Sequence, residues 1–134
     1  HKYWMPPVKE EIQVYLDFRE KYNVPIYMGE SGENTDEWVL GFRTLLDEQK
    51  IGWHFWPYKK VDNTRGPVQF DMPDNYDIII EYAESDRSTY QNIREHKPES
   101  KLVKNALEGF IENCKFKNCF PNRGYLNALG FIVK

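Results

Sequence analysis

Apolar residues in the first 58 positions occur in two alternating patterns. Short continuous runs at 24–28 and 51–58, each ending in a Gly or Pro turn, are typical of strands. Between residues 8 and 22, and again between 36 and 46, apolar side chains recur every three or four positions, which predicts amphipathic helices. Asn34 or Thr35 is the expected N-cap of the second helix, and acidic residues follow it, as the helix dipole favours.

The order of these segments predicts a repeated strand–helix unit. Residues 1–5 end a further expected strand at a Pro pair, so the chain begins β-α-β-α-β. A strand, helix and strand in succession predict parallel strands joined by a right-handed crossover. The sequence therefore predicts an α/β fold, either an open sheet or a segment of a (β/α)8 barrel.

The second half of the chain is expected to be a polar loop followed by helices. The loop is expected at 60–75, with helices from 73 to 82, from 90 to 94 and from 100 to 113. Residues 124–132 are expected to form a short apolar helix or strand. The 100–113 helix carries an apolar stripe that is expected to be buried: Leu102, Val103, Ala106, Leu107, Phe110 and Ile111.

Glu30 is the main candidate for chemistry, because it stands where the first apolar strand opens into a Gly-flanked turn. Glutamate is depleted within strands, so a carboxylate at this place indicates a catalytic nucleophile, and a solvated loop residue is the alternative for the motif taken alone. Alternation along the second strand places His54 and Trp56 on one face and Trp53 and Phe55 on the other. Two neighbouring strand ends therefore carry candidate functional groups.

These residues resemble the ends of the sixth, seventh and eighth barrel strands of glycoside hydrolase family 5, the cellulase-type endoglucanases. His1 and Tyr3 match the His-x-Tyr pair of the sixth strand, Glu30 matches the nucleophile of the seventh, and Trp56 matches the active-site Trp of the eighth. The resemblance implies that residues 1–134 form one domain, the C-terminal portion of a (β/α)8 TIM barrel without its N-terminal strands. The family's acid/base Glu lies in an Asn-Glu pair on the fourth strand, and no residue here matches it.

The resemblance implies a retaining hydrolase of β-1,4-glucan type polysaccharide in which Glu30 is the nucleophile. Tyr3 is expected to donate a hydrogen bond to Glu30, His1 to support that network or contact the sugar, and Trp56 to stack on a sugar ring. Retaining enzymes need a second carboxyl about 5–5.5 Å away. The alternative is a catalytically silent piece that binds β-glucan through its aromatic cleft.

Each of three polar residues near these strand ends has both a functional and a structural interpretation. Lys59 is either a contact for a sugar hydroxyl or part of a solvated loop pair with Lys60. Asn34 is either a sugar contact or a helix cap. Glu33 competes for the acid/base role, but support of a helix N-terminus or a sugar contact is the favoured interpretation.

The composition of the chain limits the classes of partner that it is expected to bind. The net charge is −3 and basic residues do not cluster, which argues against nucleic-acid binding, and the chain has no apolar run of 18 residues for a membrane span. No cofactor or metal is expected, because Cys114 and Cys119 supply too few ligands; a disulfide and two thiols are both consistent with their spacing. The expected partners are β-glucan and either the missing barrel half or a second copy at an unpaired strand edge. The family's polymeric substrates imply a secreted, periplasmic or cell-surface location.

Overall fold

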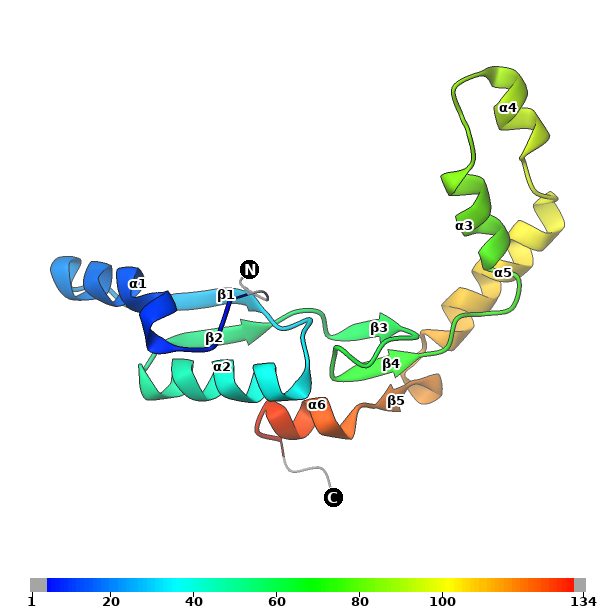
Figure 1. The fold of residues 1–134 in the computed structure, drawn as a ribbon. Helices are drawn as coiled ribbons and strands as arrows, with labels where there is room; N and C mark the ends of the chain where they lie inside the picture. Colours follow the sequence, from blue (N-terminus) through cyan, green and yellow to red (C-terminus); the bar gives the residue numbers. More distant parts are fainter. Residues whose placement is uncertain (1–4, 132–134) are drawn as a thin grey trace. The chain divides into compact units, whose positions relative to one another are not determined.

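The computed structural model describes residues 5–131 and shows a mixed α/β chain with helices and two small sheets (Figure 1). The chain divides into two compact units. Unit 1 contains the described residues up to Gln69 together with those from Phe120 onward, and unit 2 is Phe70–Cys119. The predicted α/β class is confirmed, whereas the barrel assignment stays a prediction.

Unit 1 begins with two helices and two strands in alternation: α1 (Lys9–Tyr22), β1 (Tyr27–Ser31), α2 (Asp36–Glu48) and β2 (Gly52–Phe55). β1 and β2 pair in parallel, as predicted, with α2 as the crossover (Figure 1). Asn23 ends α1 in the left-handed conformation, and the Trp38 backbone N–H donates to Thr35 Oγ1 at 3.3 Å. Of the two predicted caps, Thr35 is therefore the N-cap of α2.

The core of unit 1 lies on both sides of α2. One cluster joins α1, α2 and the start of β2, and a second joins α2 to the C-terminal helix α6 (Arg123–Ala128). Phe42 and Leu46 are almost fully buried, and each such side chain contributes roughly 1.5–3 kcal/mol of burial free energy. The clusters contain Met5, Ile12, Leu16, Phe42, Leu45, Leu46 and Ile51, and Val39, Tyr125, Ala128 and Leu129.

A three-stranded sheet occupies part of the segment for which the sequence predicts a loop. Its strands are β3 (Lys59–Val61), β4 (Val68–Phe70) and β5 (Phe120–Pro121), in the order β3-β4-β5. β4 and β5 pair antiparallel, with Val68 opposite Pro121. The loop prediction was wrong at these positions, because strands of two or three residues show too little alternation and their pairing joins distant parts of the chain.

Unit 2 is helical, with α3 (Asp77–Glu84), α4 (Tyr90–Glu95), α5 (Ser100–Asn113) and the 3-10 turn η1 (Phe116–Asn118). The predicted bounds of α5 are confirmed, and α3 begins four residues later than the expected Pro73. The Phe110 ring meets the rings of Phe70 and Tyr76 with centroids 5.3 and 5.1 Å apart. This aromatic group joins α5 to the segment that leads into α3.

The expected burial of the α5 stripe is only partly observed. Ala106 is fully buried and Phe110 is partly buried, but Leu102, Leu107 and Ile111 are exposed. The prediction was wrong for these three residues, because α3 and α4, of eight and six residues, are too short to cover a helix of 14. Cys114 follows α5 and Cys119 follows η1; both are thiols, and Cys119 Sγ donates to the Lys115 carbonyl at 3.2 Å.

Substitution of Gly32, in the turn after β1, tests the packing of this fold. Gly32 has φ +115°, and a Cβ there would lie 2.5 Å from Tyr125 Oη and 2.8 Å from the Trp56 carbonyl oxygen. Gly32→Ala is expected to lower the free energy of unfolding by about 2 kcal/mol or more through backbone strain and overpacking. Urea unfolding measures the change.

Gly29, three residues earlier and within β1, supplies the matched control. A Cβ at Gly29 meets no heavy atom within 4 Å, so Gly29→Ala is expected to change stability by less than about 0.5 kcal/mol. Equal effects of the two substitutions would contradict the packing of α6 against the turn after β1.

Candidate functional site

The C-terminal ends of β1 and β2 lie side by side. In the parallel register Met28 pairs with Trp53 and Ser31 with Phe55. Beyond the last pair, the Trp56 N–H donates to the Ser31 carbonyl at 2.6 Å, and Ser31 Oγ donates to the His54 carbonyl at 3.2 Å. These bonds hold the end of β1, where Glu30 lies, against the segment that carries Trp56.

A β-bulge determines which way Glu30 faces. Between the pairs at Met28 and Ser31, Gly29 and Glu30 stand opposite the single residue His54. Strict alternation would place Glu30 with Met28, on the face that packs against the helices, but the extra residue exposes Glu30 and buries Ser31 instead. Bulges are enriched beside active sites, where they re-aim a side chain. The alternation of apolar and polar residues along the sequence does not predict this bulge.

Among residues 5–131, helices cover one face of the β1–β2 sheet and leave the other open. Trp53 and Phe55 are partly buried and pack against the core clusters, whereas His54 is exposed. The alternating burial of β2 confirms the predicted division for Trp53, His54 and Phe55. Trp56 lies just beyond the strand, with 51% of its surface accessible. We define the open face by its exposed residues: Tyr27, Gly29, Glu30, Gly52, His54 and Trp56.

An ion pair joins the turn after β1 to β3. The Lys60 ammonium group contacts Glu33 Oε1, and both side chains are partly buried. Glu33 has φ +55°, in the left-handed region, directly after Gly32. Lys59 is the lysine predicted to contact a sugar, and its ammonium group lies 6.0 Å from the centroid of the Tyr58 ring. The pairing of Lys60 was missed because 27 residues separate it from Glu33.

Asn34 lies beside a polar groove of about 490 Å³. Its Oδ1 accepts the Thr35 backbone N–H at 2.8 Å, which supports the start of α2. Burial, and then the charge of Glu37, raise the pKa of the Asp36 carboxyl in this groove. Asn34 therefore has a structural bond and a place at the groove, whose lining residues are Asn34, Thr35, Asp36, Glu37, Thr64, Arg65 and Asn122.

Tyr125 of α6 lies completely buried below the turn after β1. Its hydroxyl makes no well-formed hydrogen bond within the described residues, although the Glu33 backbone N–H is close enough to act on it. Burial raises the pKa of Tyr125, the Glu33 N–H partly opposes this, and the charges of Glu33 and Asp36 add to the increase. The hydroxyl thus touches the turn that follows the candidate nucleophile.

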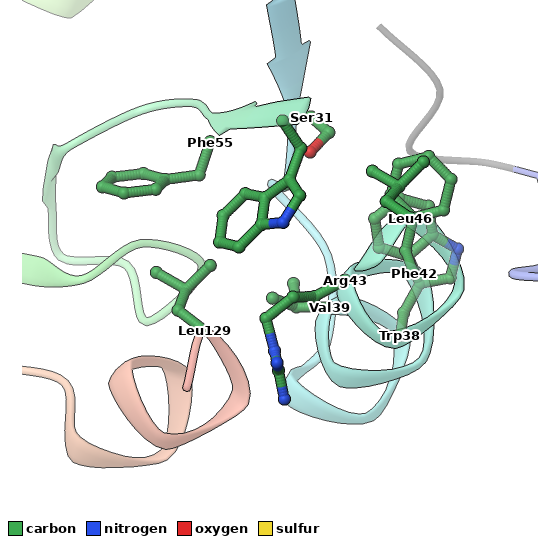
Figure 2. Close-up of a pocket in the computed structure, with 10 residues that line it drawn as sticks. Ser31, Trp38, Val39, Phe42, Arg43, Leu46, Phe55 and Leu129 are labelled. Atoms are coloured by element: carbon green, nitrogen blue, oxygen red, sulfur yellow. The ribbon is translucent and has the colours of Figure 1, made fainter. Parts of the chain in front are cut away.

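A small cavity lies beneath the sheet, between Ser31, Phe55, Leu129 and the side chains of α2 (Figure 2). Its volume of about 10 Å³ is at the lower limit for one water molecule, so a sugar ring does not fit. The cavity is a packing defect of the core.

The structure describes some of the residues predicted for the site, and others lie outside the described range. The structure brings Glu30 and Trp56 to adjacent strand ends, places Asn34 at the groove and places Lys59 beside Tyr58. His1 and Tyr3 lie outside the described residues. In the range 5–131, no group of three or more His, Cys, Asp or Glu side chains is arranged to hold a metal ion, and no helix is long and apolar enough to cross a membrane.

Lys60→Met tests the ion pair between the turn after β1 and β3. We expect it to lower the free energy of unfolding by about 1 kcal/mol, because it leaves the partly buried Glu33 carboxylate without this partner. The neighbouring Lys59→Met is the control and is expected to change stability by less than about 0.5 kcal/mol. A larger effect at Lys59 than at Lys60, measured by urea unfolding, would show that the pair is misassigned.

Tyr125→Phe tests the buried hydroxyl. Because this hydroxyl lacks a well-formed hydrogen bond, its removal is expected to raise the free energy of unfolding by up to about 1 kcal/mol. The raised pKa also gives a sign: the folded protein keeps Tyr125 neutral, so its stability is independent of this group below the unfolded tyrosine pKa of about 10 and falls as pH rises from there through the folded pKa. Thermal unfolding from pH 8 to 11 is expected to show this alkaline loss reduced in Tyr125→Phe but retained in Tyr22→Phe.

Comparisons of the chain with models of protein families, with curated proteins and with solved structures find no match. The likeness to glycoside hydrolase family 5 therefore still rests on the residues that carry it, with Glu30 and Trp56 inside the described range. What the structure itself establishes is coarser. The chain is a mixed α/β protein in which a parallel strand pair presents a carboxylate and an indole ring at adjacent ends.

Proposed function

We propose that this chain supplies the nucleophile-bearing part of a retaining glycoside hydrolase that acts on β-1,4-glucan type polysaccharide. The observation that carries the proposal is the β-bulge at Gly29 and Glu30, which exposes Glu30 on the open face. Trp56 follows the adjacent strand and offers a half-exposed indole ring for a sugar. The carboxyl ends of parallel strands are the usual place for ligands in α/β folds.

The proposed reaction divides into two steps. Glu30 Oε attacks the anomeric carbon, the glycosidic bond breaks, and the leaving oxygen takes a proton from a second carboxyl group. That group then accepts a proton from water, which displaces Glu30 and releases the sugar with retained configuration. In the proposed barrel the second carboxyl comes from an earlier strand, as in the family that the chain resembles.

Glu33 is the nearest alternative for the second carboxyl along the chain, but its contacts favour another role. The Lys60 ammonium group binds one carboxylate oxygen of Glu33, and the Glu33 backbone adopts the left-handed conformation needed for the turn. We assign Glu33 to the support of this turn, since a general acid needs its carboxyl proton directed at the leaving oxygen. Catalysis by residues 1–134 alone is therefore expected to be weak with substrates that need acid assistance.

A second candidate function is glucan binding without catalysis. The exposure of two neighbouring aromatic residues, Trp56 and Tyr58, favours it, because 51% and 52% of their surfaces remain accessible. Exposed rings of this kind bind the apolar face of a sugar whether or not a bond is later cleaved. The two functions differ in one outcome, the formation of a covalent bond to Glu30.

A 2-fluoro-β-cellobioside with an activated leaving group tests the nucleophile, because such a leaving group needs little acid assistance. Intact mass is expected to show one added 2-fluoro-cellobiosyl group, which peptide mapping places on Glu30. Glu30→Gln is expected to abolish the adduct, and Glu20→Gln, on the exposed side of α1, is the control that retains it. An adduct that persists in Glu30→Gln excludes the nucleophile role, and glucan binding without any adduct supports the second candidate.

A further inference from the structure

Unit 2 is inserted into unit 1 between two paired strands. β4 ends at Phe70, β5 begins at Phe120, and Gln69 stands opposite Phe120 in their antiparallel register. The two ends of unit 2 therefore lie next to each other, a geometry that tolerates an inserted domain. Among the described residues, the two core clusters of unit 1 contain none from unit 2, so this unit has a role apart from the core.

An apolar pocket of about 240 Å³ lies between α3 and α5, which run beside each other in unit 2 (Figure 1). Its lining residues are Ile79, Tyr82, Lys97, Pro98, Ser100 and Val103. Pockets that enclose drug-sized ligands measure roughly 300–1,000 Å³, which is more than this pocket offers. Its size suits one large apolar side chain of a partner.

Val103 also begins an apolar stripe along α5. Leu107 and Ile111 follow it at intervals of four residues, so the three side chains lie on one face of the helix. Leu107 is 45% and Ile111 61% exposed, and the stripe is roughly 12 Å long at 1.5 Å per residue. Beside it, Lys104 and Glu108 pair at 3.7 Å and add no net charge. An amphipathic helix presents anchors at this same spacing when it lies in a groove.

The charged groups beside the pocket are cations. Lys97 lines it, and the Arg87 guanidinium group lies 5.2 Å from the centroid of the Tyr82 ring. Neither cation forms an ion pair with a described residue, and Glu99, the N-cap of α5, does not line the pocket. Helical periodicity turns the acidic residues of α3 away from the pocket: Asp77, Glu81 and Glu84. A partner with carboxylates therefore complements this end of the stripe.

We propose that unit 2 is a docking module for an acidic amphipathic helix of a protein partner. One large apolar side chain of that helix fills the pocket, and two more lie along Leu107 and Ile111. Carboxylates beside the first anchor face Lys97 and Arg87. The proposal goes beyond the hydrolase reaction and does not depend on it, because every residue that it uses lies in unit 2.

Fluorescence anisotropy of labelled peptides with the whole chain tests the charge preference. The probe is a designed peptide of about 16 residues, long enough to form a helix, with Phe, Leu and Leu at four-residue spacing and glutamates beside them. It is expected to bind at least about tenfold more tightly than the same peptide with lysines in place of the glutamates. Lys97→Glu is expected to reduce this preference to less than about twofold, because it reverses a charge at the pocket.

Leu107→Ser tests the stripe. The side chain is exposed, so the fold is expected to be retained, which circular dichroism checks. Binding of the glutamate peptide is expected to weaken roughly tenfold, because an anchor of the partner loses its contact. Phe18→Ser removes a similarly exposed apolar side chain from α1 in unit 1 and is the matched control with unchanged affinity.

Ser100→Trp tests the pocket separately from the stripe. Ser100 is exposed at the start of α5 and lines the pocket, so an indole ring at this position occupies the space of the partner's anchor. The wild type is expected to bind the Phe peptide roughly tenfold more tightly than a version with Ala in place of Phe. Ser100→Trp is expected to bind the two peptides equally.

Four outcomes overturn the proposal. The first two are equal binding of the glutamate and lysine peptides by the wild type and a preference for Phe that survives in Ser100→Trp. A dimer in sedimentation that Leu107→Ser dissociates is the third, because a second copy would then cover the stripe. The fourth is binding of octanoate that Lys97→Glu abolishes, without binding of either peptide, which assigns the pocket to small carboxylates. None of these outcomes bears on the Glu30 adduct, which is measured without unit 2 ligands.

Discussion

The parallel pairing of β1 with β2 is the constraint on which the rest of unit 1 depends. Parallel strands need a crossover, and α2 provides it while its apolar residues fill both core clusters. The same pairing sets the two strand ends side by side, so Glu30 and Trp56 become neighbours although 26 residues separate them. Burial of the α2 side chains therefore stabilises the arrangement of the site as well as the fold.

The bulge locally changes which residues of β1 face the open side of the sheet. In a regular strand, a shift of one residue moves every following side chain to the opposite face of the sheet. The extra residue at Gly29 and Glu30 places the carboxylate on the open side and then returns Ser31 to the buried side, where its hydroxyl bonds the His54 carbonyl. Strand pairing thus continues to Trp56 without burying a charged group, which would cost several kcal/mol unless it were paired.

Sequence patterns identified the features that depend on neighbours along the chain. Period-two alternation divided Trp53 and Phe55 from His54 and Trp56, and helical spacing located α1, α2 and α5. Two of the missed features join distant residues: β4 with β5, and Lys60 with Glu33. The α5 stripe shows the complementary error, because amphipathic spacing reveals an apolar face but does not reveal whether another element covers it.

The C-terminal helix α6 links these distant contacts to the site. The Asn122 side chain accepts the Tyr125 N–H and donates to the Thr64 carbonyl, so it caps α6 and holds the turn between β3 and β4. Tyr125 in turn lies against the backbone of Gly32, where only a glycine leaves room for its hydroxyl. A single short helix thereby supports both the turn after the candidate nucleophile and one wall of the polar groove. The geometry at Glu30 consequently depends on a segment more than 90 residues further along the chain.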